Sequence, residues 1–147
     1  MPRPLCARLA FHALIVLTLG LLAGFPWANV INGTMEGDSR AWRMAHLEGL
    51  LNALLMLAVA AAGSLLTLSE ARSRALVWLL LLAGYGNIVA SIVGASTGHR
   101  GLTPTGPAPN LVVFVLFMVA VVAVFVAVAL ALAGAHRTAR QLTASDP

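Results

Sequence analysis

Residues 111–133 read LVVFVLFMVAVVAVFVAVALALA, without one charged or polar side chain. Crossing the hydrocarbon core of a bilayer takes about 20 predominantly apolar residues in a helix. A run of this length and character is therefore typical of a transmembrane helix. It sets the environment in which the rest of the chain has to be interpreted.

Three further stretches meet the same criterion, so we expect membrane-spanning helices over about residues 9–30, 44–68, 75–97 and 110–134. The chain has 147 residues, of which 60% are hydrophobic and only 10% are charged, whereas soluble domains carry about 25% charged residues. Arg3 and Arg8 before the first stretch resemble a signal peptide, but the apolar run before Pro26 is too long and three spans follow. We predict an all-α integral membrane protein, a single domain over residues 1–147 with four transmembrane helices.

The charged residues predict the orientation of the chain in the membrane. Every basic residue is an arginine, and the nine arginines are scattered over termini and loops, which excludes a nucleic-acid-binding patch. With four spans, six arginines fall on the side of the two termini and three on the other side; the six are Arg3, Arg8, Arg72, Arg74, Arg137 and Arg140. The positive-inside rule then places both termini in the cytoplasm, and we expect a bacterial inner membrane.

The connections between the expected helices differ in character. Residues 69–74 (SEARSR) form a short polar step, which predicts that the second and third helices are antiparallel neighbours. Residues 98–109 are rich in proline and glycine, so this stretch cannot be helical throughout.

Polar side chains inside the spans are the most informative feature, because they are costly in a membrane and usually have a function. His46, Glu48 and Asn52 follow one another in the second span, and Asn52 lies about 9 Å deeper than His46 at 1.5 Å per residue. In the third span a stripe of small and polar residues recurs at helical spacing, comprising Gly84, Asn87, Ser91 and Gly94. Such stripes are typical of helix contact faces in membranes. We therefore expect the polar groups of the two helices to converge at one depth, whereas the fourth helix is structural or faces lipid.

Structural interpretations of the same residues stay open at this point. A pair such as Asn52 and Asn87 often only joins two helices, for about 1 kcal/mol. His46 near the outer surface is compatible with an interfacial side chain in contact with lipid headgroups. Glu48 is compatible with a partner such as Arg43 or with water at the interface.

Several motifs resemble the styrene oxide isomerase family of small bacterial four-helix membrane proteins. The similarity includes His12 in AFHA, residues 42–46 (WRMAH) and the six-residue step from His46 to Asn52. It continues through residues 84–87 (GYGN) to residues 100–103 (RGLT), whereas the fourth helix matches in character only.

The resemblance implies a homotrimer that binds haem b between its subunits, with His46 as the axial iron ligand. The ferric iron would act as a Lewis acid on the oxygen of a small hydrophobic epoxide. The carbon–oxygen bond would open, a hydride would migrate to the neighbouring carbon, and an aldehyde or ketone would form without net redox change. Neither water nor a nicotinamide cofactor would take part.

Ligation of the iron by one histidine suits this chemistry, because it leaves the sixth coordination position open. His12 is the only other histidine inside a span, and the topology places it toward the cytoplasmic face, away from His46. His99 in an outer loop and His136 beyond the fourth helix are expected in solvent. Asn52, deeper on the helix of His46, could donate a hydrogen bond to the developing alkoxide.

The chain departs from the family at two positions of the third helix. Ala83 and Ser91 stand where the family carries an aspartate and a tyrosine beside the pocket, and Glu48 replaces a small residue. We hypothesise that Glu48 substitutes for the lost carboxylate. The candidate catalytic residues are therefore Asn52, Glu48, Asn87 and Ser91.

Three functions follow from these residues. The first is a haem-dependent epoxide isomerase with an altered substrate pocket. The second is a non-enzymatic membrane haem-binding protein, a carrier or sensor that kept His46 and lost the catalytic groups. The third is a helical scaffold without a cofactor.

Overall fold

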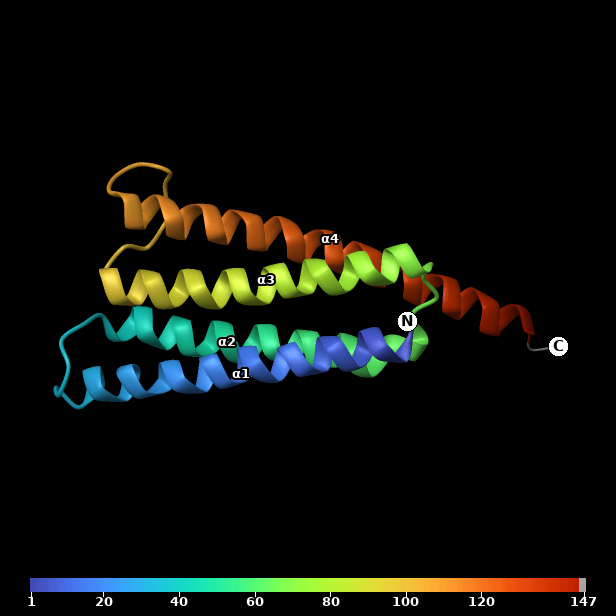
Figure 1. Ribbon diagram of the computed structural model, residues 1–147, viewed down its shortest axis with the longest axis horizontal. Coiled ribbons are helices and arrows are strands. Elements are labelled where there is room, and N and C mark those ends of the chain that lie inside the picture. The colour runs from blue at the N-terminus through green and yellow to red at the C-terminus, as the bar shows by residue number, and fades with distance from the viewer. Residues whose placement is uncertain (146–147) are drawn as a thin grey trace.

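The computed structural model describes residues 1–145, which fold into four long helices without a strand (Figure 1). The helices are α1 (Arg3–Ile31), α2 (Ser39–Ala61), α3 (Glu70–Thr97) and α4 (Ala108–Ser145), and a short 3₁₀ turn, η1 (Ala62–Leu65), follows α2. Within the described part of the chain, all four are long and apolar enough to cross a membrane. The predicted all-α membrane fold is thus confirmed, and the architecture is that of a multi-pass membrane protein.

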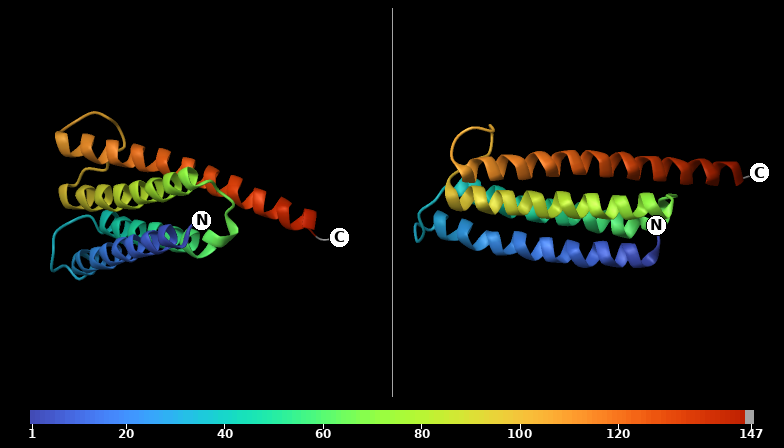
Figure 2. Two further views of the ribbon diagram at one scale, coloured as in Figure 1. Left: turned by 45° about the vertical axis from the view of Figure 1, so that its right-hand side comes forward. Right: turned by 45° about the horizontal axis from the view of Figure 1, so that its top comes forward.

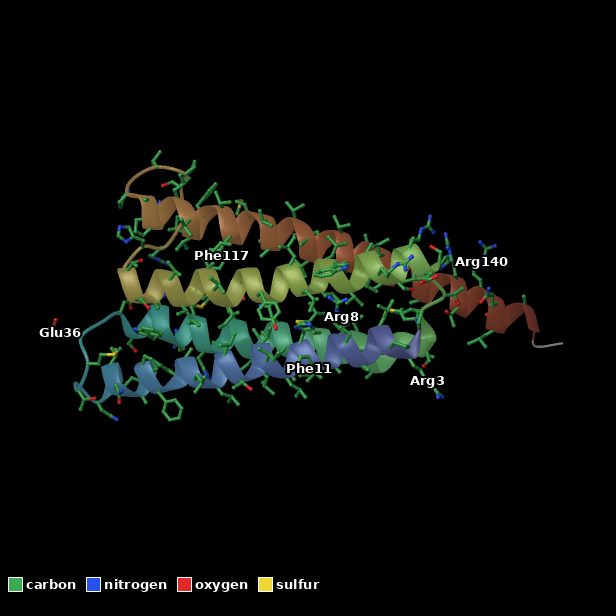
Figure 3. The ribbon with its side chains drawn as sticks, in the orientation of Figure 1. Arg3, Arg8, Phe11, Glu36, Phe117 and Arg140 are labelled. Carbon is green, nitrogen blue, oxygen red and sulfur yellow. The ribbon has the colours of Figure 1, made fainter. Side chains whose placement is uncertain are left out.

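The helices run antiparallel to one another in sequence order, so both ends of the described chain lie at one end of the bundle (Figures 1 and 2). The connections 32–38 and 98–107 lie together at the opposite end. Arg3 and Arg140 mark the end with the termini, and Glu36 marks the other (Figure 3). The uneven distribution of arginines inferred from the sequence therefore corresponds to the two ends of the molecule.

The helix bounds differ from the predicted spans, because hydropathy marks only the part of a helix that lies in the apolar layer. α1 starts at Arg3, earlier than expected, and ends at Ile31, close to the predicted 30 with Pro26 inside the helix, while α4 extends to Ser145 rather than 134. Within a membrane helix, neighbouring groups and small local adjustments compensate the one hydrogen bond that a proline removes. α2 ends at Ala61, seven residues before the predicted 68, where the chain changes to the 3₁₀ turn.

The polar step at residues 69–74 is largely the first turn of α3 rather than a loop. Ser69 precedes the helix, and its hydroxyl accepts a hydrogen bond from the backbone N–H of Arg72 at 3.4 Å. Glu70 forms an ion pair with Arg74 one turn later, at 2.9 Å. Residues 66–69 alone make the connection, so α2 and α3 are antiparallel neighbours as predicted. Residues 98–107 are non-helical, and α3 ends at Gly98 with a φ of 72°.

Two glycines allow the backbones of α1 and α2 to touch. A Cβ atom built on Gly20 would lie 2.8 Å from the backbone of Gly49, closer than any real side chain can pack. Gly20 and Gly24 form a small-xxx-small pattern on α1, which is the usual way for membrane helices to approach closely. The pair α1–α2 is therefore fixed in register at this crossing.

α3 lies at the centre of the bundle, between the pair α1–α2 and α4 (Figure 1). The buried core includes Val16, Met56, Leu80 and Ile88 from the three helices α1, α2 and α3. Gly84 makes room for the sulfur of Met56, which would lie 2.7 Å from a Cβ atom at that position. α4 packs mainly along α3 and exposes large apolar side chains such as Phe125 on its other side, in agreement with a structural or lipid-facing helix.

Candidate functional site

His46 lies in the second turn of α2 and points toward α1. Its Nδ1–H donates a hydrogen bond to the backbone carbonyl of Gly20, at an N–O distance of 2.8 Å. A backbone carbonyl can only accept, so this bond fixes the tautomer and leaves Nε2 with a free lone pair. Nε2 has no hydrogen-bond partner within residues 1–145. The imidazole is therefore oriented as metal-binding histidines usually are, with the second nitrogen held by the protein.

The glycines of α1 build the seat for this ring. The contact of Gly20 with α2 brings its carbonyl within reach of the imidazole. A Cβ atom at Gly24 would lie 3.1 Å from Nδ1 of His46, so a larger residue there would crowd the ring. Trp27 lies one turn further along α1, and its ring centre is 5.6 Å from that of His46. The local sequence of α1 thus determines how the histidine is held.

Glu48, Asn52 and Asn87 form one hydrogen-bonded network on the other side of α2. The amide nitrogen of Asn52 donates to the backbone carbonyl of Glu48 at 2.8 Å and to its carboxylate at 2.9 Å. The amide nitrogen of Asn87 on α3 donates to the side-chain oxygen of Asn52 at 3.1 Å. The polar groups of the two helices therefore converge at one depth, as the spacing predicted. Glu48 has no ion pair with Arg43 in the described part of the chain, and its partner is Asn52.

The hydrogen bonds of this network determine which amide N–H groups are free to donate to a substrate oxygen. Both N–H groups of Asn52 are occupied by Glu48, so Asn52 has none left for a developing alkoxide in this arrangement. Asn87 uses one N–H for Asn52, and its second N–H has no partner within residues 1–145. Asn87 is therefore the amide with a free donor in this network.

The candidate residues lie on two sides of α2. His46 faces α1 through Gly20, whereas Glu48 and Asn52 face α3 through Asn87. Successive helical residues are rotated by about 100°, so positions 46 and 48 leave the helix in nearly opposite directions. Within one copy of the chain, the candidate ligand and the candidate catalytic network are not brought together.

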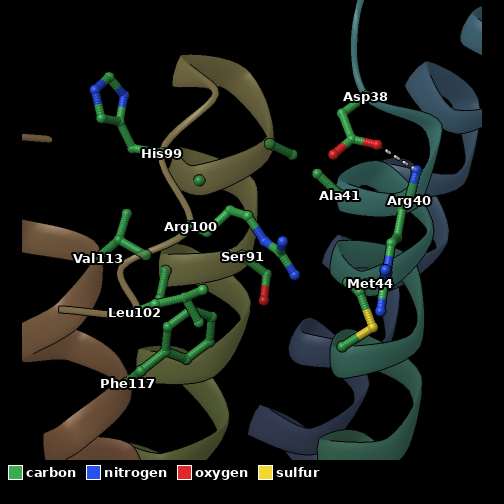
Figure 4. A pocket seen from close by; sticks show the side chains of 13 residues that line it. Asp38, Arg40, Ala41, Met44, Ser91, His99, Arg100, Leu102, Val113 and Phe117 are labelled. Atoms are coloured by element: carbon green, nitrogen blue, oxygen red, sulfur yellow. Dashed lines mark hydrogen bonds between the residues drawn. The ribbon is translucent and has the colours of Figure 1, made fainter. Parts of the chain in front are cut away.

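Ser91 contributes to a third feature, a cavity of about 210 Å³ between α2, α3, the start of α4 and the loop 98–107. Its floor is apolar and includes Met44, Val113 and Phe117, while Asp38, Arg40, His99 and Arg100 contribute polar groups (Figure 4). Ser91 is only 7% exposed, and its hydroxyl points into this space. His46, Glu48, Asn52 and Asn87 do not line the cavity.

The sequence reasoning missed the cavity residues on the outer loop. His99 was expected in solvent; it is partly exposed and borders the cavity, but its imidazole points away from it (Figure 4), with Nδ1 bonded to the carbonyl of Thr97 at 2.7 Å. The sequence analysis named Arg100 only within the motif RGLT that resembles the family, and it predicted no role for this residue. The signal that could have indicated both is their position in the loop between two long helices, because binding residues are often carried by loops on a rigid scaffold.

The remaining histidines lie away from His46. His12 on α1 forms a 2.9 Å hydrogen bond with the hydroxyl of Tyr85 on α3, and it lies about 12 Å along α1 from Gly20. His136 on α4 is exposed. Within the described residues, no three His, Cys, Asp or Glu side chains gather into a metal site. Within these residues, a metal centre would therefore have at most two protein ligands of these kinds.

Comparison with known proteins adds one positive finding. A family model described as styrene oxide isomerase matches residues 5–136, which includes parts of all four helices and both long loops. No curated protein matches the chain.

Proposed function

The chain belongs to the styrene oxide isomerase family, and on this premise we propose that it isomerises a small hydrophobic epoxide to an aldehyde or ketone with haem b held by His46. The observation that carries the proposal is the hydrogen bond from Nδ1 of His46 to the carbonyl of Gly20. It leaves Nε2 of His46 as the atom that would hold the iron of a haem, which would supply Lewis-acid chemistry when bound. The packing of the His46 ring against Gly20 and Gly24 of α1 supports the same assignment.

The residues fit such a cofactor. A neutral imidazole with one nitrogen bound to backbone is a suitable haem ligand, and the surrounding surface of α1 and α2 is apolar. When bound, the ferric haem supplies a Lewis acid for the epoxide oxygen. In the overall reaction one carbon–oxygen bond breaks, a hydride moves with its electron pair to the adjacent carbon, and a carbon–oxygen double bond forms. No atom enters or leaves, so the reaction requires no co-reactant.

The chain's own polar groups have separate roles in this proposal. The free N–H of Asn87 donates a hydrogen bond toward the oxygen on which charge develops. Asn52 positions Asn87 through its side-chain oxygen, and Glu48 in turn fixes Asn52. The Glu48 carboxylate is the only acidic group of this network and takes the place of the carboxylate that the family carries at the position of Ala83. The apolar helices around the network exclude water, so that the opened epoxide rearranges rather than hydrolyses.

We propose a homotrimer with the cofactor between subunits, and the placement of these groups supports it. Because His46 and Glu48 lie on opposite sides of α2, a haem bound to His46 of one copy reaches the polar network of a neighbouring copy more readily than its own. A closed symmetric ring repeats this contact at each interface. We propose that each site is completed by two copies of the chain.

For the location of the protein we propose a bacterial inner membrane with both termini in the cytoplasm. The support is the excess of arginines at the end of the bundle that holds the termini. A cysteine in place of Glu36, in a chain without Cys6, should react with a membrane-impermeant maleimide from the periplasmic side. Reaction only after lysis would reverse the orientation.

A second candidate is a non-enzymatic haem carrier or sensor. It is favoured by Ala83, which is 1% exposed and offers no polar group at a position where the family has a carboxylate. Such a protein would keep the His46 seat and bind haem without turnover.

Absorption spectroscopy and product analysis distinguish these proposals. Detergent-purified protein, expressed with adequate haem supply, should have a Soret band that His46→Ala lacks. Conversion of styrene oxide to phenylacetaldehyde would support the isomerase, whereas a Soret band without conversion would support the carrier. A parent protein without a Soret band would overturn both haem-dependent proposals.

A further inference from the structure

The cavity above the polar network combines an apolar floor with unpaired positive charge. It begins one helical turn toward the outer end from the network: Met44 precedes Glu48 by four residues on α2, and Ser91 follows Asn87 by four on α3. Residues four apart lie on the same helix face, about 6 Å from each other along the axis. The inner end of the cavity therefore lies about one helical turn from Asn87, which does not itself line it.

Arg100 is the main polar group of the cavity. Its guanidinium extends from the loop into the space between α3 and α2 (Figure 4), and it has no ion pair or hydrogen bond with residues 1–145. Arg40 on the α2 side likewise has no side-chain ion pair there. Asp38 is the one carboxylate at the rim, and it accepts a hydrogen bond from the backbone N–H of Arg40 at 2.8 Å. Two guanidinium groups against one carboxylate leave the cavity net positive.

Ser91 is a second polar group on the wall of the cavity. Its side chain is more than nine-tenths buried, points into the cavity, and has no hydrogen-bond partner among the described residues. Among the described residues only the hydroxyl oxygen of Ser73 is both buried and without a hydrogen-bond partner, so the oxygen of Ser91 is accessible from the cavity. The hydroxyl is therefore available to a molecule that occupies the space.

The loop that presents Arg100 is anchored to α4. The side chain of Asn110 accepts a hydrogen bond from the backbone N–H of Gly101 at 3.0 Å and donates to the carbonyls of Thr103 and Thr105. Gly101 has a φ of 61°, and a Cβ atom there would collide with Val113. The loop therefore holds one conformation, in which Arg100 faces the cavity.

The size of the cavity restricts the ligand. An apolar cavity of about 150 Å³ holds a benzene molecule, so about 210 Å³ admits an aromatic ring with a substituent of a few atoms. A two-chain lipid is too large to enter. Arginine prefers carboxylate or phosphate groups, which it can bind with two parallel hydrogen bonds. Of these, a carboxylate leaves room for the ring.

We propose that the substrate is an aryl epoxide with a carboxylate group, bound with the carboxylate at Arg100 and the ring on the floor formed by Met44, Val113 and Phe117. The hydroxyl of Ser91 donates a second hydrogen bond to the substrate, and the epoxide lies toward Asn87. This inference rests on the proposed isomerase function and specifies its substrate class. Isomerisation remains internal to the epoxide, so the carboxylate is a recognition group and does not react.

Turnover provides the first test, with 4-(oxiran-2-yl)benzoate and styrene oxide as a matched charged and neutral pair. The holoprotein should convert the benzoate with a kcat/KM about tenfold or more above that of styrene oxide, because a hydrogen bond to a charged group contributes that much. Arg100→Gln should lower kcat/KM for the benzoate at least tenfold more than for styrene oxide, mainly through KM. Arg43→Gln removes an exposed arginine of α2 outside the cavity and should preserve the preference. A preference for styrene oxide in the parent protein would overturn the inference and leave the isomerase function intact.

Calorimetric binding of unreactive 4-ethylbenzoate is the second test, independent of turnover. The parent protein should bind it, whereas Arg100→Gln and the cavity-filling Ser91→Tyr should not. Binding without conversion of either epoxide would support the carboxylate site and overturn the isomerase function. No binding by the parent protein would overturn the carboxylate site even if styrene oxide is converted. Loss of the Soret band in Arg100→Gln would also overturn it, because the guanidinium would then hold carboxylates of the cofactor.

Discussion

The imidazole of His46 and the backbone carbonyl of Gly20 are joined by a 2.8 Å hydrogen bond across the interface of α1 and α2. The same glycine is the point at which the two helices touch. Packing of the helix pair and orientation of the candidate ligand therefore depend on one residue, and a change there should affect both.

Gly20→Ala should destabilise the protein and impair cofactor binding. The added methyl group would lie 2.8 Å from the backbone of Gly49, and overpacking of this kind costs about 1–3 kcal/mol. The helices would separate, and the bond to His46 would lengthen. Thermal unfolding in detergent should shift to lower temperature, and the Soret absorbance per protein should decrease. The exposed neighbour Leu21 is the control, since Leu21→Ala should leave both quantities close to those of the parent.

Glu48→Gln should abolish isomerase activity and leave haem content intact. Glutamine keeps the length of the side chain and can still accept the bond from Asn52 through its oxygen, so only the charge is removed. Haem content, read from the Soret band, should equal that of the parent because Glu48 faces away from His46. Retained activity would exclude Glu48 as the substitute for the lost carboxylate.

Asn87→Leu should lower kcat more than it lowers stability. A hydrogen bond between membrane helices contributes about 0.6 kcal/mol on average, whereas loss of one donor to a developing oxyanion costs about 10²–10³ in kcat. Single-turnover rates and thermal unfolding of the same preparation would separate the two effects. A loss of stability with an unchanged rate would mean that the pair Asn52–Asn87 only joins the helices.

Mixed oligomers of His46→Ala and Glu48→Gln chains should regain activity that neither variant has alone. If a site takes His46 from one copy and Glu48 from its neighbour, random mixing at equal amounts regenerates about a quarter of all sites in closed rings, and about one site in three in the mixed trimers alone. The two variants can be co-expressed with different tags and purified on both. Inactive mixed oligomers with full parental assembly would indicate that each site belongs to one chain.

Much of the fold could be predicted from the sequence, because the membrane requires long apolar helices and tolerates few alternatives. The pairing of Asn52 with Asn87 could also be predicted, since depth along two antiparallel helices follows from residue spacing. The start of α3 could not be predicted from hydropathy, because its first turn is a polar sequence that is stabilised by a serine cap and an ion pair. The end of α1 at Ile31, by contrast, lies within one residue of the predicted 30.

The candidate site was predictable in its residues but not in its arrangement. The sequence does not reveal which faces of α1 and α2 meet, so the bond from His46 to Gly20 and the separation of His46 from Glu48 became apparent only in three dimensions. The cavity depends on a loop whose shape is set by Gly101 and Asn110, while its opposite wall is formed by α2, which lies far from this loop in the sequence. Long-range contacts of this kind leave no periodic pattern in the chain.

The contact of Gly20 with Gly49 determines which segments of the chain can change in length without moving His46. Sliding α1 along α2 by one residue would push a leucine side chain into the opposing backbone, because Leu19, Leu21 and Leu50 flank the two glycines. The close contact of the two glycines therefore prevents the helices from sliding along each other, and so it fixes the depth of His46 below the membrane surface. Since this depth is fixed inside the bilayer, the connection at residues 32–38 is free to lengthen or shorten without displacing the ligand.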